Sequence, residues 1–285
     1  MATIQRGSGW SIRLVFNLYR VFGYRFTYYL MYPVTFFYFI FASNVKSALK
    51  IYYENLGLEF NNQIYFRHLF MFAVCMCDRF ISKYDCGSYH YEHDDVKLLE
   101  TMADDGSIFL LSHFGGWASS TCQAVTSNTI NVVMKEVMLG SIKDIEESIE
   151  NPDQKIEIID QNQDKLKVSI QIANALSSRE CVAFMADRAS DHGSTQKMIF
   201  LGKIASFNTS PFKISYRRKI PAIAIFTINV GMQKYYTKTK KIELDYSLDE
   251  SKAVTKALSE YVKTLEDVIK KHPNQWFNLY DFWTK

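Results

Sequence analysis

The sequence predicts an α/β fold in which a mainly parallel or mixed central sheet is flanked by helices and preceded by an N-terminal membrane-associated helical segment. Residues 26–45 carry no charge and are rich in aromatic side chains. From residue 107 onward, short apolar runs typical of buried strands alternate with amphipathic stretches typical of helices. Such alternation indicates a sheet with helices on its faces. With 48% hydrophobic residues in a chain of 285, a large core can be buried.

The uncharged run lies between Arg25 and Lys46, and as a helix its 20 residues would span roughly 30 Å, the thickness of bilayer hydrocarbon. It is also rich in tyrosine and has Pro33 near its middle, and tyrosine prefers the headgroup boundary. The segment therefore either spans once or lies in the interface as a broken aromatic helix inserted from one face. A buried core helix is the remaining alternative.

Positive charge surrounds this run. Glu54 is the first acidic residue, and the arginines that precede it are Arg6, Arg13, Arg20 and Arg25. A basic, aromatic N-terminus favours a surface of anionic lipid. Over the whole chain the net charge is only +3, which does not predict a nucleic-acid partner. The cysteines show no CxxC spacing, so we expect no metal site and no cofactor.

The chain divides by pattern near residue 84. Residues 47–84 have helical apolar spacing and residues 84–95 read as a polar loop, so we expect an N-terminal helical, membrane-associated region over 1–84 and an α/β domain over 85–285. Strands are expected over residues 107–112, 131–134, 155–159, 181–186, 221–230 and 235–244. Two helices are expected to begin near residues 117 and 209, and two more to cover residues 165–176 and 251–271.

His113 and Asp187 each follow a predicted strand directly, which is where sites gather in parallel sheets. His113 alone among the six histidines also precedes a glycine pair, Gly115 and Gly116. A histidine in this place can act as general base and take a proton from an attacking hydroxyl. Acyl transfer from a thioester requires such a base and a donor to the oxyanion.

Several blocks of the sequence resemble a known family in the same order. SHFGGW at 112–117 resembles the first motif of the bacterial lipid A biosynthesis acyltransferases, within the lysophospholipid acyltransferase superfamily. ADR at 186–188, IFLGKIA at 199–205, NTSP at 208–211 and HPNQWF at 272–277 resemble later motifs. Asp78-Arg79 and the region of Pro33 are similar to the subgroup associated with glycosyltransferases. The resemblance extends over nearly the whole chain.

The resemblance implies an acyltransferase that moves a fatty acyl chain from an acyl carrier protein or coenzyme A thioester to a hydroxyl of a lipid or glycolipid, as in lipid A biosynthesis. It also implies a place on the cytoplasmic face of the cell inner membrane, as a single-pass or monotopic protein. A basic cluster at 217–219 is a candidate contact for an acidic carrier protein, and a solvated helix end is the alternative.

The sequence departs from the family at Ala118, where the resemblance implies an acid that follows His113 after four intervening residues and orients its ring. Another group, such as Glu136, Asp187 or a backbone carbonyl, can take that role. Alternatively, the acid was removed in a variant, or the protein is a catalytically disabled homologue that binds lipid without acyl transfer. We predict His113 and Asp187 as the catalytic pair.

The predicted substrate-binding residues each have a structural alternative. Arg188 suits a phosphate, or forms an ion pair with its neighbouring aspartate. Lys203 is a phosphate contact or an exposed lysine. Thr209 begins a helix whose N–H groups can bind an anion, or is an ordinary cap. Gly115 and Gly116 offer N–H groups to an oxyanion, or permit a tight turn.

Overall fold

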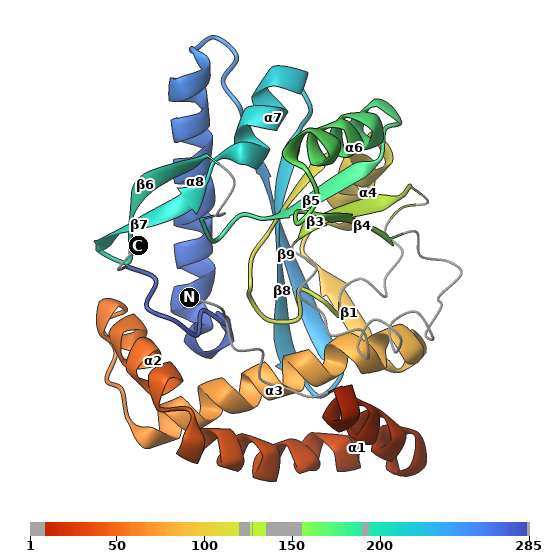
Figure 1. Ribbon diagram of the computed structural model, residues 1–285, viewed down its shortest axis with the longest axis vertical. Helices are drawn as coiled ribbons and strands as arrows, with labels where there is room; N and C mark the ends of the chain where they lie inside the picture. The colour runs from red at the N-terminus through yellow and green to blue at the C-terminus, as the bar shows by residue number, and fades with distance from the viewer. Residues whose placement is uncertain (1–8, 120–125, 127, 135–155, 190–193, 284–285) are drawn as a thin grey trace.

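The computed structural model describes residues 9–119, 126, 128–134, 156–189 and 194–283. A seven-stranded sheet stands at the centre, and two helices of the N-terminal part, α1 and α3, pack together across one end of it (Figure 1). The fold is α/β with a mostly parallel sheet, as the alternation of apolar runs and amphipathic stretches predicts.

The helices are α1 (Gly9–Phe41), α2 (Ser43–Asn55), α3 (Asn62–Tyr84), α4 (Val96–Asp104), α6 (Lys165–Ser177), α7 (Ser210–Arg218) and α8 (Glu250–Lys271), with short 3-10 turns η1 (Cys86–Ser88) and η3 (Pro273–Gln275). The strands are β1 (His90–His93), β2 (Ile108–Leu111), β3 (Ile130–Met134), β4 (Ile156–Asp160), β5 (Cys181–Met185), β6 (Thr195–Phe200), β7 (Lys203–Asn208), β8 (Ala222–Gly231) and β9 (Lys234–Ile242).

The main sheet has the order β1-β9-β8-β2-β5-β3-β4. Neighbouring strands are parallel except for β8 and β9, which form an antiparallel hairpin. Strands β6 and β7 form a separate antiparallel ribbon that lies beside α8 (Figure 1). The ribbon is fastened to α8 by the Leu201 N–H, which donates to Glu266 Oε1 at 2.6 Å.

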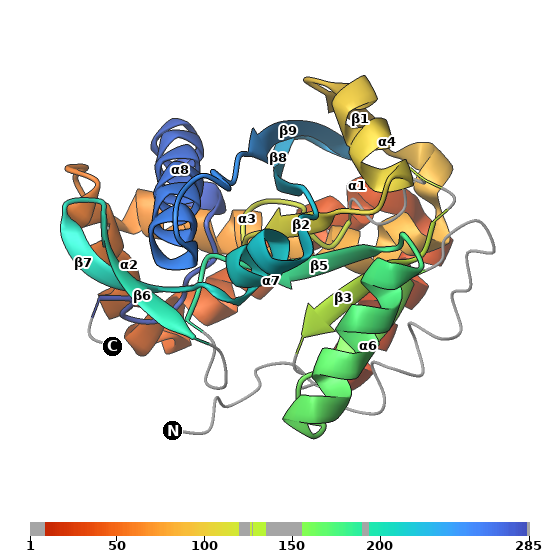
Figure 2. The ribbon, with the colours of Figure 1, turned by 90° about the horizontal axis from the view of Figure 1, so that it is seen from above.

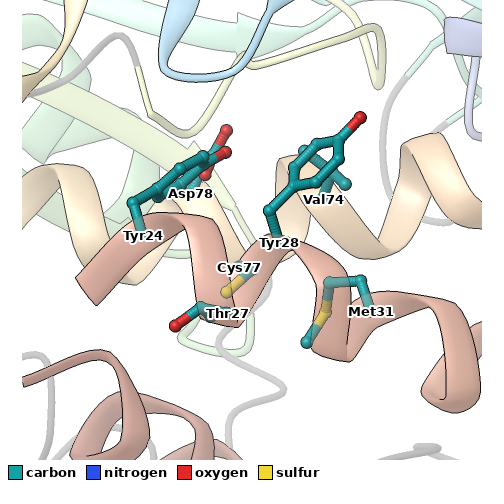
Figure 3. A pocket seen from close by; sticks show the side chains of 7 residues that line it. All are labelled: Tyr24, Thr27, Tyr28, Met31, Val74, Cys77 and Asp78. Carbon is teal, nitrogen blue, oxygen red and sulfur yellow. The ribbon is translucent and has the colours of Figure 1, made fainter. Parts of the chain in front are cut away.

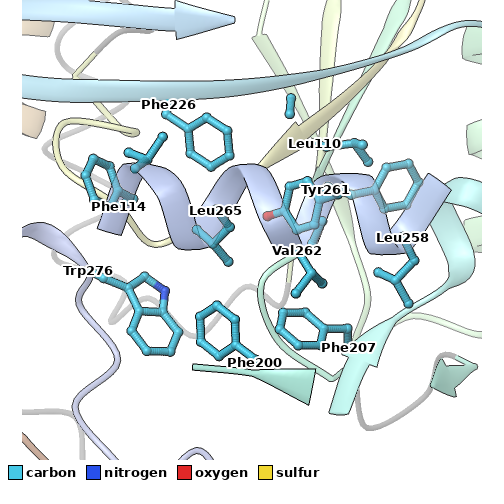
Figure 4. Close-up of a cluster of buried hydrophobic side chains, with 14 of the residues drawn as sticks. Leu110, Phe114, Phe200, Phe207, Phe226, Leu258, Tyr261, Val262, Leu265 and Trp276 are labelled. Atoms are coloured by element: carbon cyan, nitrogen blue, oxygen red, sulfur yellow. The ribbon is translucent and has the colours of Figure 1, made fainter. Parts of the chain in front are cut away.

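Helices cover both faces of the sheet (Figure 2). Successive side chains of a strand point to opposite faces, so Ile108 and Leu110 of β2 join a large buried cluster with α6 and α8, whereas Phe109 joins a second cluster with α4. The large cluster is dense in aromatic rings, among them Phe226 and Tyr261 (Figure 4). Because apolar side chains are buried on both faces of the sheet, the central strands appear in the sequence as continuous apolar runs.

Some expected elements differ from the observed ones. Residues 84–95 are not a loop throughout, because β1 lies there and pairs with β9 at the sheet edge. Helix α4 was not predicted, although Asp95 caps it by accepting from the Leu98 N–H at 2.9 Å. The single helical stretch expected over 47–84 is two helices, α2 and α3. Residues 117–119 form a turn, and the helix expected to begin near Trp117 would otherwise fall on residues 120–125, which lie outside the described residues.

The N-terminal helices share the large core with the sheet. Leu49 and Tyr52 of α2 and Tyr65 of α3 are buried in the same cluster as β2, β8 and α8. Tyr52 also donates its hydroxyl to the Pro273 carbonyl at 2.8 Å. The predicted boundary at residue 84 coincides with the end of α3, but buried side chains on its two sides pack together.

Helix α1 presents an apolar face to the outside. It bends at Gly23, where φ is 76°, and continues through Pro33, so the helix is broken before the aromatic run of residues 26–45 and not at the proline within it. Its most exposed large apolar side chains are Val21, Phe22, Phe26, Tyr29, Tyr32, Phe36, Phe37, Ile40 and Phe41. Within the described residues, no helix combines the length and apolar character needed to cross a membrane.

Candidate active site

His113 and Asp187 meet because their strands are neighbours. Strands β2 and β5 are parallel, with Leu111 opposite Met185, and each of the two residues lies two positions beyond that pair. His113 Nδ1 is 2.9 Å from Asp187 Oδ1, and the His113 backbone N–H donates to Asp187 Oδ2 at 3.0 Å. The carboxylate thus fixes both the backbone and the ring of the histidine.

Asp187 is completely buried, and three hydrogen bonds satisfy its carboxylate. The third comes from the indole N–H of Trp276, which donates to Oδ2 at 3.0 Å. Burial by itself raises the pKa of this carboxyl, but His113, the charge of Arg188 and the indole together hold it at about 2. Asp187 is therefore an anion at neutral pH.

His113 is a neutral base in this setting. Burial and the positive charge of Arg188 lower its pKa, and the opposite effect of Asp187 is smaller. With Nδ1–H donating to the carboxylate, the lone pair lies on Nε2, the nitrogen that can accept a proton. The side chain keeps 25% of its surface exposed, so a substrate can reach the ring. This arrangement suits general-base catalysis on a hydroxyl.

The two glycines after His113 form a tight turn against β8 and β9. Gly115 donates its N–H to the Gln275 carbonyl and Gly116 to the Thr227 carbonyl, each at 2.8 Å. Gly115 has φ of 55°, and a Cβ there would lie 2.0 Å from the Thr227 oxygen. Because both N–H groups are already engaged, the turn is the role that the geometry supports for these glycines, rather than the oxyanion donors considered from the sequence.

The segment after α8 contributes hydrogen bonds that hold the site. The Phe277 N–H donates to the His113 carbonyl at 2.7 Å, and Gln275 exchanges two side-chain hydrogen bonds with the Asn229 backbone, at 2.8 and 2.9 Å. Trp276 is wholly buried among aromatic rings (Figure 4) and yet supplies a donor to Asp187. From the sequence, this segment is recognisable only by its resemblance to a family motif, and no local signal indicates its hydrogen bonds to the site.

Arg188 lies beside the pair. One terminal nitrogen, Nη2, donates to the Phe277 carbonyl at 2.7 Å, and the guanidinium carbon is 5.3 Å from the centre of the Tyr280 ring. Trp117 lies on another side of His113, with ring centres 5.8 Å apart, and Arg79 of α3 is placed over Trp117 at 5.8 Å. Arg79 is a further cation near the site that sequence reasoning did not assign.

Other predicted residues are not brought to the His113–Asp187 pair. Lys203 is exposed on β7. Thr209 is buried, and its hydroxyl is hydrogen-bonded to the Ser194 carbonyl at 2.9 Å. Within the described part of the chain, neither residue forms a hydrogen bond to the pair. The basic cluster at 217–219 precedes β8 and therefore lies at the opposite end of the parallel strands from the site, with Arg217 paired to Glu250.

The family resemblance implies an acid at the position of Ala118, and other groups can take its place beside His113. Ala118 is 8% exposed and so lies in a nearly closed position. Of the substitutes that the sequence leaves open, Asp187 contacts Nδ1 of His113 directly, whereas Glu136 lies outside the described residues. Among these substitutes, the carboxylate that follows the neighbouring strand β5 is the one in contact with the His113 ring.

Comparison with known proteins identifies the family. The sequence profile described as bacterial lipid A biosynthesis acyltransferase matches residues 91–285, which is more than half of the chain. The chain belongs to this family. As a lipid A acyltransferase family member it is expected to transfer acyl groups to a lipid acceptor. The match includes β2, β5 and the segment after α8, which together build the site, and begins after α1, α2 and α3. No curated protein matches the chain.

The electrostatics of the pair can be tested in solution. We expect the His113 ring to titrate below its ordinary pKa near 6.5. Replacement Asp187→Asn removes the anion that favours the imidazolium and should lower the pKa further. Replacement Arg188→Gln removes the cation that disfavours it and should raise the pKa. NMR titration of the imidazole resonances measures both shifts, and shifts in the same direction would contradict the assigned charges.

Proposed function

We propose that the protein transfers a fatty acyl chain from an acyl carrier protein or coenzyme A thioester to a hydroxyl of a lipid or glycolipid acceptor, with His113 as general base. The observation that carries the proposal is the hydrogen bond between His113 Nδ1 and Asp187 Oδ1. It orients the ring, fixes the tautomer with a free Nε2 and places a negative charge where the imidazolium will form.

In the proposed reaction, Nε2 takes the proton of the acceptor hydroxyl as its oxygen attacks the thioester carbonyl carbon. The tetrahedral intermediate then collapses, the carbon–sulfur bond breaks, and the imidazolium returns the proton to the leaving thiolate. The products are an ester and a free thiol. Asp187 stays ionised throughout, because its pKa of about 2 is far below neutral pH.

Arg188 is the residue that we propose for the anionic groups of the reaction. Its guanidinium is close enough to His113 to lower the pKa of the ring, and it is held in place by the Phe277 carbonyl and Tyr280. A cation in this place stabilises an oxyanion or a phosphate on the donor or acceptor. Gly115 and Gly116 shape the site, and Lys203 and Thr209 remain candidates for more distant contacts with the substrate.

The protein is proposed to act at the cytoplasmic face of the inner membrane, held by α1. Large apolar side chains are exposed along α1, one of which, Tyr32, also packs against Phe70 of α3, and Arg13, Arg20 and Arg25 are exposed on the same helix. Apolar groups enter the acyl boundary and arginines attract anionic headgroups, which favours the monotopic arrangement of the two considered from the sequence. A lipid acceptor would then reach the site from the membrane.

The competing hypothesis is a disabled homologue that binds lipid without acyl transfer. Its motivation is Ala118, which removes the local acid expected by resemblance. The contact between Asp187 and His113 argues for the active enzyme, because the ring retains an anionic partner. The neutral state of His113 argues in the same direction, because a permanently protonated ring cannot act as a base.

Replacement His113→Ala should abolish acyl transfer while the protein stays folded. Mass spectrometry of membrane lipids from cells with the parent protein should show a species one acyl chain heavier, absent with the variant. Replacement Asp187→Asn should reduce turnover by up to about 10⁴-fold, as for the orienting acid of a triad. If His113→Ala produces the same heavier lipid as the parent, the proposed mechanism is wrong.

Replacement Ala118→Glu separates the two hypotheses. Since Asp187 already accepts from Nδ1 of His113, a second carboxylate gains no hydrogen bond there, and an unpaired charge in this nearly closed position destabilises the fold. We expect unchanged or lower turnover and a lower unfolding temperature. A rise in turnover by orders of magnitude would support the lost-acid hypothesis instead.

Membrane association should depend on the apolar face of α1. The double variant Phe22→Ser and Phe37→Ser removes two exposed rings and should weaken binding to phosphatidylglycerol vesicles by about 100-fold or more, since burial of each ring contributes about 1.5–3 kcal/mol. The matched control is Leu166→Ser with Ile170→Ser, two exposed apolar residues of α6. Equal binding of both double variants in a flotation assay would refute the role of α1.

A further inference from the structure

A buried carboxylate outside the catalytic pair joins three parts of the chain. Asp78 of α3 is wholly buried, and its Oδ1 accepts from the Tyr89 hydroxyl at 2.8 Å. Its Oδ2 accepts from the hydroxyl of Tyr235 in β9. Tyr24 of α1 lies against it at the edge of a narrow recess between α1 and α3 (Figure 3) and also hydrogen-bonds to the carboxylate.

Burying the Asp78 carboxylate costs free energy, and the hydrogen bonds that offset this cost keep its donors in place. An ionised carboxylate away from water is stable only when hydrogen bonds replace its hydration. Burial raises the pKa of Asp78 to about 6, and the three phenols oppose that rise by favouring the anion. Loss of one phenol would leave the carboxylate less satisfied, and for this reason the position of Tyr235 is tied to Asp78.

The ring of Tyr235 packs directly against the turn that follows His113. A Cβ on Gly116 would lie 2.3 Å from Tyr235 Cε1, so only a glycine at this position leaves room for the ring. The Gly116 carbonyl in turn accepts from the Ser119 hydroxyl at 2.9 Å. Tyr91, stacked on Tyr235 with ring centres 5.4 Å apart, donates its hydroxyl to the Ser119 carbonyl at 2.7 Å. The turn is therefore held on this side by two stacked tyrosines.

We propose that Asp78 is a positioning residue for the catalytic turn and acts through Tyr235 to hold His113 at its working distance from substrate. Asp78 takes no part in the chemistry, which is that of the function proposed above and on which this inference rests. Through Tyr24, the same carboxylate ties the turn to α1, so that the helix proposed to lie on the membrane and the catalytic turn share one fixed frame.

Two tyrosines of the same carboxylate provide a matched pair of variants. Tyr235→Phe and Tyr89→Phe each remove one phenol from Asp78, but of these two rings only that of Tyr235 is among the nearest neighbours of Gly116. A purely structural role predicts equal effects. A positioning role predicts that Tyr235→Phe alone lowers kcat, with little change in KM, because the thioester itself is not contacted.

The full-length variants are compared by thiol release from palmitoyl-coenzyme A and from palmitoyl-acyl carrier protein, in the presence of a bacterial lipid extract. We expect Tyr235→Phe to lower kcat by about 10- to 100-fold, since a misplacement of about 1 Å can cost about 100-fold. Tyr89→Phe should keep kcat within about 2-fold of the parent value, although its unfolding temperature should fall about as far as that of Tyr235→Phe. Asp78→Asn should lower kcat at least as far as Tyr235→Phe.

NMR of the His113 imidazole gives a second measurement that does not depend on turnover. Its resonances should move in Tyr235→Phe and stay unchanged in Tyr89→Phe. Equal effects of the two phenylalanine variants on kcat, or on these resonances if turnover is undetectable, would overturn the inference even if Asp78→Asn does not fold. His113→Ala distinguishes the two levels: parent-like activity there refutes the proposed function, whereas an inactive His113→Ala with equal tyrosine variants refutes only the role of Asp78.

Discussion

The buried carboxylate of Asp187 is the constraint around which the site is built. A completely buried carboxylate with fewer hydrogen bonds would cost free energy, so the segments that carry its donors have to be in place at the same time. They come from the end of β2, through His113, and from the segment after α8, through Trp276. The ends of β2 and β5 and the C-terminal segment are therefore fixed relative to one another by one group, and the His113 ring is oriented as a consequence.

This solution differs from the local one that the family resemblance implies. An acid shortly after the histidine in sequence belongs to the same turn, and its position depends on that turn alone. Here the carboxylate that contacts the His113 ring follows the neighbouring strand β5, and the turn after His113 includes Gly115, Gly116 and Ala118. The glycines allow a close approach to β8 and β9, which a side chain at either position would prevent.

The helices at the N-terminus are tied to the α/β part by polar contacts within an aromatic core. Tyrosine suits this role because its ring packs as an apolar group while its hydroxyl can reach a buried acceptor. Tyr52 reaches the Pro273 carbonyl, close to the segment that carries Trp276, and Tyr24 and Tyr235 meet at Asp78. One side of α1 is used in this docking, and exposed apolar side chains remain elsewhere on the helix.

The sequence by itself determined the α/β class, most of the central strands and the placement of His113 and Asp187 at strand ends, because buried strands and the residues that follow them leave a local pattern. It also carried the motifs of the family. It did not determine β1, a short polar strand that exists through pairing with β9, or the dependence of Asp187 on Trp276.

Only the tertiary structure showed that Asp187, one of the groups that the sequence left open, contacts the His113 ring, and only it showed that the N–H groups of Gly115 and Gly116 are already engaged. These facts depend on which strands are neighbours and on where the C-terminal segment crosses the sheet. Contacts of this kind join residues far apart in the sequence, such as Asp187 and Trp276, which are 89 positions apart, and no local periodicity records them.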